Sequence, residues 1–309
     1  EITCRDWSSD VCSSDLPQWL VDLLSQEIPA AELESLLASN NAEPPTTIQT
    51  NTTKITPDAL AETLAAQGVT VETHPWLDGC FTLRGTGDLE QLKAFRDGLF
   101  LVQDTASRLV VLAAQPEAGQ HILDACGAPG GKSFSTAIAI GDDGSILSCD
   151  IHPSKVKQIQ KGAKRLGLAS IQSQIRNAKE YDPSLDEQFD LVLADAPCSG
   201  LGIIRKKPDI RNKDPEPLKD LPRIQGDILE NVSRYVKSGG VLVYSTCTVL
   251  ERENQDVVRG FLAKHPEFTL EPLTLPDAIG TVEEGMLTLW PHIHGTDGFF
   301  LSKMRKQGT

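Results

Sequence analysis

Two cysteines stand at the expected carboxyl ends of two apolar strands. Cys198 lies in the segment Asp-Ala-Pro-Cys-Ser-Gly, and Cys247 lies in the segment Tyr-Ser-Thr-Cys-Thr. Ligands of open parallel sheets bind at this edge, so we expect both thiols to face one site. A third predicted strand runs into a glycine-rich turn at residues 126–131 and then into a helix. Together the three segments predict a cofactor bound beside a nucleophile.

The glycine-rich turn favours S-adenosylmethionine over two other cofactor classes. A phosphate-binding NTPase loop would need glycine in place of Cys126, and a dinucleotide fingerprint has a different glycine spacing. S-adenosylmethionine has no pyrophosphate, and glycines at a helix amino terminus let backbone N–H groups approach a ligand closely. The predicted cofactor contacts in this segment are Ala125, Cys126, Gly127, Ala128, Pro129, Gly130, Gly131 and Lys132.

Two polar residues end the next two predicted strands. Asp150 follows Gly131 by 19 residues, a position from which a carboxylate can bind the ribose hydroxyls of a nucleoside cofactor. Its alternative role is to cap the helix that begins near Pro153. Asn177 closes the third strand and is predicted to meet the adenine, with a simple turn residue as the alternative.

The remaining cysteines carry no predicted chemistry. Function is favoured over packing for Cys198 and Cys247 because Asp195, three residues before Cys198, would be costly on a buried strand without a role. Cys80, Cys126 and Cys149 fit inert buried side chains. The seven cysteines of the chain lack the spacing of a disulfide framework or of a zinc site, and the histidines do not cluster with them. We therefore expect reduced thiols and no metal.

The charge is distributed unevenly along an acidic chain of net charge -14. Residues 17–104 hold 13 acidic and 4 basic side chains, whereas residues 105–309 hold 26 and 24. A basic segment directly follows the Cys198 motif, and a local patch of this kind can bind phosphate despite the global acidity. A solvated loop explains the charge equally well. The predicted RNA contacts in this segment are Arg205, Lys206, Lys207 and Arg211.

Element patterns divide the chain into three parts. Residues 1–16 show no period and are expected to be foreign to the fold, so Cys4 and Cys12 receive no role. Residues 17–115 predict a small helical plus α+β domain. Residues 116–309 alternate strand and helix, which predicts an α/β domain with a doubly wound, mostly parallel sheet. No apolar run reaches the length of a membrane helix, and no secretion signal is recognisable, so we expect a cytoplasmic protein without a membrane partner.

The three motifs, in this order, resemble those of RNA cytosine-5 methyltransferases, most closely the ribosomal small-subunit methyltransferase B (RsmB or Sun) family. The resemblance runs from about Pro17 to the end. It implies a class I S-adenosylmethionine-dependent methyltransferase with a Rossmann-like, seven-stranded sheet, preceded by a small RNA-binding domain. The implied reaction is methylation of carbon 5 of a cytosine, with 16S ribosomal RNA as the expected substrate, transfer RNA as the alternative, and a monomeric enzyme.

The resemblance also implies a role for each site residue. Cys247 would add to carbon 6 of the cytosine, and Cys198 would help to remove the carbon 5 proton. Asp195 would bind ring nitrogen 3 and the amino group, and Lys132 would favour the thiolate. The family commonly has aspartate at the position of Asn177, and its members usually carry a helical RNA-binding domain ahead of Pro17. We therefore expect altered cofactor affinity and incomplete substrate affinity.

Three other interpretations stay open at this point. A DNA-type cytosine methyltransferase would use Cys198 as the nucleophile, which leaves the strand-end position of Cys247 unexplained. A non-catalytic RNA-binding assembly factor would keep the fold without needing the two thiols or Asp195. A methyltransferase acting on a small molecule would not need the basic segment.

Overall fold

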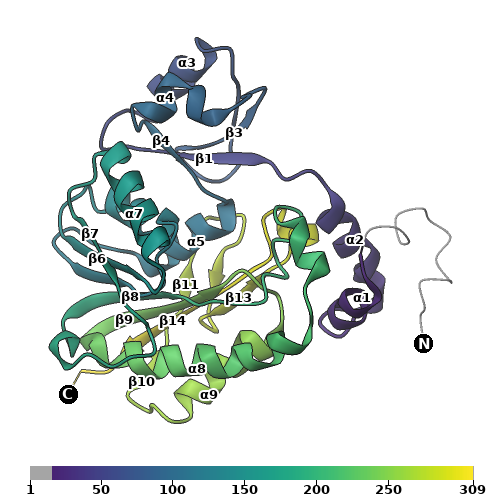
Figure 1. The fold of residues 1–309 in the computed structure, drawn as a ribbon, viewed down its shortest axis with the longest axis vertical. Helices are drawn as coiled ribbons and strands as arrows, with labels where there is room; N and C mark the ends of the chain where they lie inside the picture. The colour runs from purple at the N-terminus through teal and green to yellow at the C-terminus, as the bar shows by residue number, and fades with distance from the viewer. Residues whose placement is uncertain (1–15, 309) are drawn as a thin grey trace.

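The computed structural model describes residues 16–308, so the expectations for Glu1 to Asp15 lie outside the described residues. Within that range the strands form a small antiparallel sheet, a large mixed sheet and a two-stranded ribbon (Figure 1). The described helices are all too short or too polar to cross a bilayer.

The small sheet has the order β2-β3-β1-β4, and all its pairs are antiparallel. Its strands are β1 (Thr46–Thr50), β2 (Thr70–Thr73), β3 (Cys80–Arg84) and β4 (Phe100–Val102). The helices α3 (Pro57–Ala65) and α4 (Lys93–Arg96) belong to this part. The Thr56 side chain caps α3 by accepting the N–H of Ala59, and Pro57 occupies the first helical position. Ile48, Leu60 and Phe100 are buried in its core.

Two helices precede the small sheet and pack against loops of the large part. They are α1 (Gln18–Leu24) and α2 (Ala30–Asn41). Their leucines at three-to-four spacing form one apolar cluster with Leu201, Ile204 and Leu250, which follow β8 and β9. The amino-terminal helices therefore cover the two loops that carry the strand-end cysteines.

The large sheet runs β10-β14-β9-β8-β5-β6-β7, with β13 also paired to β14. Its strands are β5 (His121–Asp124), β6 (Ser145–Asp150), β7 (Ile171–Ile175), β8 (Phe189–Asp195), β9 (Val236–Thr246), β10 (Phe268–Leu270), β13 (Met286–Leu289) and β14 (Phe299–Lys306). The strands β5 to β9 are parallel, and β14 is antiparallel to its neighbours. The sheet thus has eight strands in the seven positions expected, because β10 and β13 share the outer edge of β14.

Helices cover both faces of the large sheet. They are α5 (Thr105–Ala114), α6 (Gly131–Ala139), α7 (Pro153–Leu166), α8 (Leu221–Val232), α9 (Gln255–Leu262) and the short α10 (Pro291–His294). In Figure 1, α5 and α7 lie on one side of the sheet and α8 and α9 on the other. Consecutive strand residues divide between these two cores: Ile122 faces one and Leu123 the other. The doubly wound α/β class predicted from the sequence is confirmed.

The apolar spacing of residues 218–236 would suit one long helix, but the structure divides this segment. A 3₁₀ turn (Glu216–Asp220) leads into α8, and Val236 already belongs to β9. Val236 pairs with Phe189 ahead of a bulge, so burial against the sheet overrides the helical spacing. The ribbon strands β11 (Leu273–Thr274) and β12 (Thr281–Val282) are too short for a periodic signal.

Candidate active site

A cavity of about 760 Å³ opens at the carboxyl edge of the parallel strands. Residues of all three motifs line it, together with Asp104 from the end of the small part and Phe299 from β14. Every predicted cofactor residue except Gly130 lines this cavity, and so do Cys198 and Cys247. The doubly wound topology therefore gathers segments that are more than a hundred residues apart in the chain.

The two strand-end thiols lie side by side. Cys198 Sγ and Cys247 Sγ are 3.2 Å apart, a hydrogen-bonding distance for sulfur. Parallel pairing of β8 with β9 sets Asp195 level with Ser245, and the Ala196 N–H donates to the Ser245 carbonyl at 2.9 Å. The two strands therefore end at the same level of the sheet, and the residues that follow them bring both thiols to one site.

The surroundings make the two thiols unequal. The hydrogen bond from Cys198 lowers the pKa of Cys247, and nearby Lys132 and Lys207 act in the same direction against burial and Asp195. The same hydrogen bond and burial raise the pKa of Cys198 well above its ordinary value. Of the two thiols, Cys247 is therefore the one that is more readily deprotonated.

An ion pair stands beside the thiols. The Lys132 Nζ lies 2.7 Å from Asp195 Oδ2, and the Ser245 hydroxyl donates to Asp195 Oδ1 at 2.8 Å. Lys132 comes from the first turn of α6, is only 8% exposed, and lies 4.8 Å from the centroid of the Phe299 ring. The carboxylate and the ammonium group are thus held at the cavity wall, where they can bind polar edges of a substrate.

The glycine turn is shaped by close packing. A Cβ on Gly127 would lie 2.3 Å from Ser148 Oγ, and Gly130 has a φ of 115°, which side chains rarely adopt. Buried Asp124 stands behind the turn, where it accepts the Ser133 hydroxyl at 2.6 Å, and burial raises its pKa to about 6. The turn therefore leaves its backbone open to the cavity, which fits a cofactor that approaches the main chain.

Asp150 and Asn177 line the same cavity. One oxygen of Asp150 accepts the His152 N–H at 2.8 Å, and His152 itself occupies the position before α7. The Asn177 amide donates to Glu180 at 2.9 Å, and its oxygen accepts the Lys179 N–H at 3.2 Å. Asn177 therefore has the local bonds of a turn residue while it lines the cavity.

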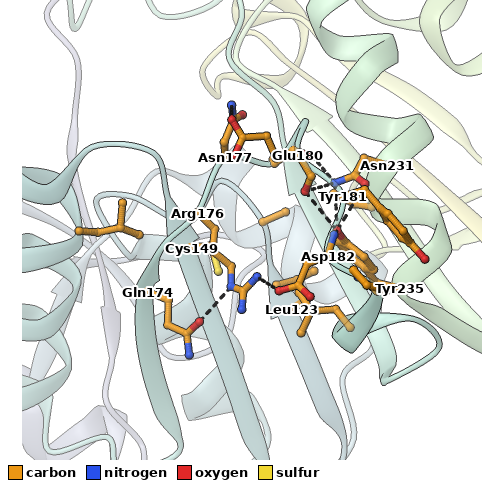
Figure 2. Close-up of a pocket in the computed structure, with 16 residues that line it drawn as sticks. Leu123, Cys149, Gln174, Arg176, Asn177, Glu180, Tyr181, Asp182, Asn231 and Tyr235 are labelled. Atoms are coloured by element: carbon orange, nitrogen blue, oxygen red, sulfur yellow. Dashed lines mark hydrogen bonds and ion pairs between the residues drawn. The ribbon is translucent and has the colours of Figure 1, made fainter.

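A second cavity of about 490 Å³ shares Asn177 and Arg176 with the first. Figure 2 shows Arg176 between Gln174 and Asp182, with Asn177 apart from them. Tyr235 and Asn231 hydrogen-bond to the backbone of the loop that follows β7.

The basic segment after Cys198 differs from the prediction of an RNA-binding patch. Arg205 is 7% exposed and pairs with Asp297, and Lys206 bridges Asp297 and Asp104 at 2.7 and 2.6 Å. Arg211 donates to the backbone and side chain of the α2 terminus. Arg205, Lys206 and Arg211 therefore hold the loop in place, because buried carboxylates and carbonyls engage their charges. Lys207 is exposed at the cavity.

Other candidate chemistry is limited within residues 16–308. No group of three or more histidine, cysteine or acidic side chains there could hold a metal ion. Burial raises the pKa of Cys80 to about 11 and that of Cys149 to about 12, and it also raises the pKa of Cys126. These three thiols stay protonated at neutral pH, in agreement with their interpretation as inert.

Several site residues carried no signal strong enough to be singled out from the sequence. They are Asp104, Gln225, Glu253, Asp297 and Phe299. Glu253 lies in the polar run at residues 251–256 and Asp297 lies between Thr296 and Gly298, so the local sequence gives no sign that either is buried. Gln225 sits on the buried face of α8, which its type does not predict.

Comparison with known proteins places the chain among methyltransferases. Residues 111–305 match the family described as 16S rRNA methyltransferase RsmB/F, and residues 16–90 match its ferredoxin-like domain. The probable ribosomal RNA small subunit methyltransferase B of Bacillus subtilis (strain 168) is 39% identical over 94% of this chain and 66% of its own length. The chain thus spans slightly less than two thirds of this curated relative.

Two solved structures share the fold. The crystal structure of PH0851 superposes with a TM-score of 0.88 at 31% identity and covers 94% of this chain and 66% of its own. A methyltransferase homolog protein from Pyrococcus horikoshii gives a TM-score of 0.77 at 27% identity, over 94% of this chain and 100% of its own.

Proposed function

Because the chain belongs to the 16S rRNA methyltransferase RsmB/F family, we propose that it methylates carbon 5 of a cytosine in RNA, with 16S ribosomal RNA as the expected substrate. The observation that carries the mechanism is the thiol pair, with Cys247 and Cys198 Sγ 3.2 Å apart and only Cys247 favoured as a thiolate. Cys247 is the proposed nucleophile.

Nucleophilic addition solves a specific chemical problem. Carbon 5 of cytosine is too weak a nucleophile to accept a methyl group, and addition of the Cys247 thiolate to carbon 6 makes it an enamine carbon. Asp195 binds ring nitrogen 3 and the amino group, and Lys132 offsets the charge that develops on the ring. The bound cofactor supplies the methyl group for carbon 5.

Cys198 then acts as the base that restores the aromatic ring. When Cys247 bonds to carbon 6, its sulfur loses its negative charge. The hydrogen bond between the sulfurs then no longer stabilises the protonated form of Cys198. Cys198 can then release that proton to solvent water, and the resulting thiolate accepts the proton from carbon 5. The carbon–sulfur bond breaks as the ring double bond returns, and the Cys247 thiolate is regenerated.

The proposed cofactor is S-adenosylmethionine. The open backbone of residues 125–131 and the carboxylate of Asp150 fit the methionine part and the ribose, and Asn177 stands where the adenine would lie. Asp124 and Asp195 supply negative charge near the cavity wall, which suits a sulfonium cation. The size of the cavity, about 760 Å³, leaves room for a flipped base beside the cofactor.

RNA is proposed to lie over α7 as well as Lys207. The helix carries five basic and no acidic side chains, in a chain of net charge -14. Lys157, Lys161 and Lys164 are exposed on one face and form no ion pair with any residue of 16–308. Lys155, in the first turn, lines the cavity, although a helix dipole disfavours cations there. Such a surface fits a phosphate backbone.

A trapped intermediate tests the mechanism. Cys198→Ala protein, incubated with 16S ribosomal RNA and S-adenosylmethionine, should accumulate a covalent protein–RNA adduct that survives denaturing electrophoresis, because the carbon 5 proton cannot leave. Cys247→Ala protein should form no adduct. The opposite result, an adduct only when Cys198 is present and Cys247 is replaced, would assign nucleophilic attack to Cys198 and overturn the proposal.

A further inference from the structure

We propose that buried Glu253, held by Gln225, is a positioning residue that decides which of the two thiols keeps the proton. In this role its charge keeps Cys198 protonated and leaves the thiolate on Cys247. The inference rests on the proposed function, since it assigns the order in which the two sulfurs act. It concerns a carboxylate that does not line the cavity and has no part in the motifs identified from the sequence.

Glu253 and Gln225 hydrogen-bond to the backbone on both sides of Cys198. Glu253 Oε2 accepts the Ser199 N–H at 2.9 Å and the Gln225 Nε2 at 3.0 Å. The same Gln225 Nε2 donates to the Pro197 carbonyl at 3.0 Å. The residues before and after Cys198 are therefore tied to one buried polar pair, which fixes where its sulfur points.

The carboxylate is itself firmly placed. Glu253 is 0% exposed and ends the 3₁₀ turn (Glu251–Glu253) after β9. Its backbone carbonyl accepts the hydroxyl of buried Tyr244 at 2.6 Å. The next residue, Asn254, accepts the Thr246 hydroxyl and donates to the Thr248 carbonyl, on either side of Cys247. One short segment therefore anchors the backbone around both thiols.

Two thiols 3.2 Å apart share one proton in a way that geometry alone does not decide. The sulfur hydrogen bond lowers the pKa of Cys247, burial and Asp195 oppose it, and Lys132 and Lys207 add to the lowering. At Cys198 the sulfur hydrogen bond and burial raise the pKa, and the charges of Glu253 and, after it, Asp195 add to them. Charges of opposite sign thus bias the same proton toward Cys198.

The structure offers a substitution that separates the charge of Glu253 from its hydrogen bonds. Glu253 Oε1 is buried and has no hydrogen-bond partner within residues 16–308. In Glu253→Gln the amide oxygen can keep both bonds of Oε2, and the NH₂ group takes the position of Oε1. This substitution removes the charge of Glu253 and keeps its hydrogen bonds to Ser199 and Gln225.

The test is thiol labelling of the whole protein without RNA or cofactor, so its outcome does not depend on methylation. Limiting iodoacetamide at pH 7.5, with mass spectrometry of the two peptides, should label mainly Cys247 in the wild type. In Glu253→Gln the ratio of Cys247 to Cys198 labelling should fall at least tenfold, equivalent to about one pKa unit. Glu253→Asp, which keeps the charge, should retain the preference for Cys247.

Glu251→Gln is the matched control, because Glu251 lies in the same turn but is exposed and paired with Arg259. Its labelling ratio should equal that of the wild type. A Glu253→Gln protein that keeps its circular dichroism melt and shows an unchanged ratio would overturn the proposal.

A second measurement keeps the proposal testable if Glu253→Gln fails to fold. In Cys247→Ser, with Glu253 intact, the pH dependence of Cys198 labelling should still give a pKa above that of an ordinary thiol. A Cys198 that titrates in the ordinary range in this variant would contradict the role of Glu253. Loss of methylation with a wild-type labelling pattern would instead count against the proposed function alone.

Discussion

At the scale of single residues, the site depends on a small number of charges placed around two sulfurs. Lys132 has a double role, because it pairs with Asp195 at 2.7 Å and lowers the pKa of Cys247. Lys132 is 8% exposed and therefore weakly screened by water. Its removal should change the electrostatic environment of both Asp195 and Cys247.

Lys132→Met should shift the pH dependence of Cys247 attack. The cation favours the thiolate, so its loss raises the pKa of Cys247, and the reactive form appears only at higher pH. We expect adduct formation in the Cys198→Ala background to slow at least tenfold at pH 7, with the acid limb of the rate profile moved upward by about one unit. The measurement is the single-turnover rate of adduct formation from pH 6 to pH 10.

Lys132→Arg is the control for this prediction, since it retains a positive charge at the first turn of α6. It should keep the wild-type position of the acid limb even if its rate is lower. Superimposable profiles of the wild type and Lys132→Met would remove Lys132 from the activation of the thiol.

At the scale of elements, most of the exposed basic charge near the site lies on helix α7, and the loop after Cys198 contributes Lys207. The loop cations Arg205 and Lys206 are tied to Asp297 and Asp104, and the exposed lysines of α7 are not paired within residues 16–308. Lys157, Lys161 and Lys164 are spaced so that they share one face over roughly 10 Å of helix.

Replacing these three lysines together by glutamine should weaken RNA binding without affecting the fold. Each lysine that neutralises a phosphate releases counterions, so the slope of log K against log salt should decrease by about 2 in magnitude for single-stranded RNA. Binding measured between 50 and 300 mM salt checks this, and the melting temperature should stay unchanged because the three side chains are exposed.

A matched triple variant at Lys219, Arg223 and Lys264, exposed residues of the α8 and α9 side, removes the same charge elsewhere. It should leave the slope near the wild-type value. Equal slopes for the two triple variants would mean that net charge, and not the α7 surface, governs the interaction.

At the scale of the whole molecule, one ion network joins the end of the small part to the loops of the large sheet. Lys206 contacts Asp104, which caps α5 after the small sheet, and Asp297, which precedes β14. Asp297 is 4% exposed, and it is also paired with Arg205. The two carboxylates are far apart in the chain, and the network holds them together at the wall of the cavity.

Lys206→Met should destabilise the protein by about 3 kcal/mol, because a partly buried carboxylate at Asp104 and a buried one at Asp297 lose a cation. Urea unfolding at pH 7 measures the change. Lys207→Met, at the exposed neighbouring position, should change the free energy of unfolding by less than about 0.5 kcal/mol. Similar losses for both variants would show that the loop, and not the network, is responsible.

The sequence by itself determined the fold class and the family, because both can be recognised from patterns among neighbouring residues. Alternating apolar strands and amphipathic helices specify a doubly wound sheet, and the strand-end positions of Asp150, Asp195 and Cys247 follow from the parallel order. Motif spacing also identified the glycine turn. Each of these signals needs only neighbouring residues to be read.

Tertiary structure decided how charges are shared. Arg205 and Lys206 look like phosphate ligands in the chain, but packing brings Asp297 and Asp104 to them from about 90 and 100 residues away. In the same way, Glu253 reaches Ser199 and Gln225 reaches Pro197 from later segments. The type of an ionisable side chain does not show whether it is solvated or paired, so its partner is decided only when distant segments pack together. The same packing decides which of Cys198 and Cys247 is more readily deprotonated.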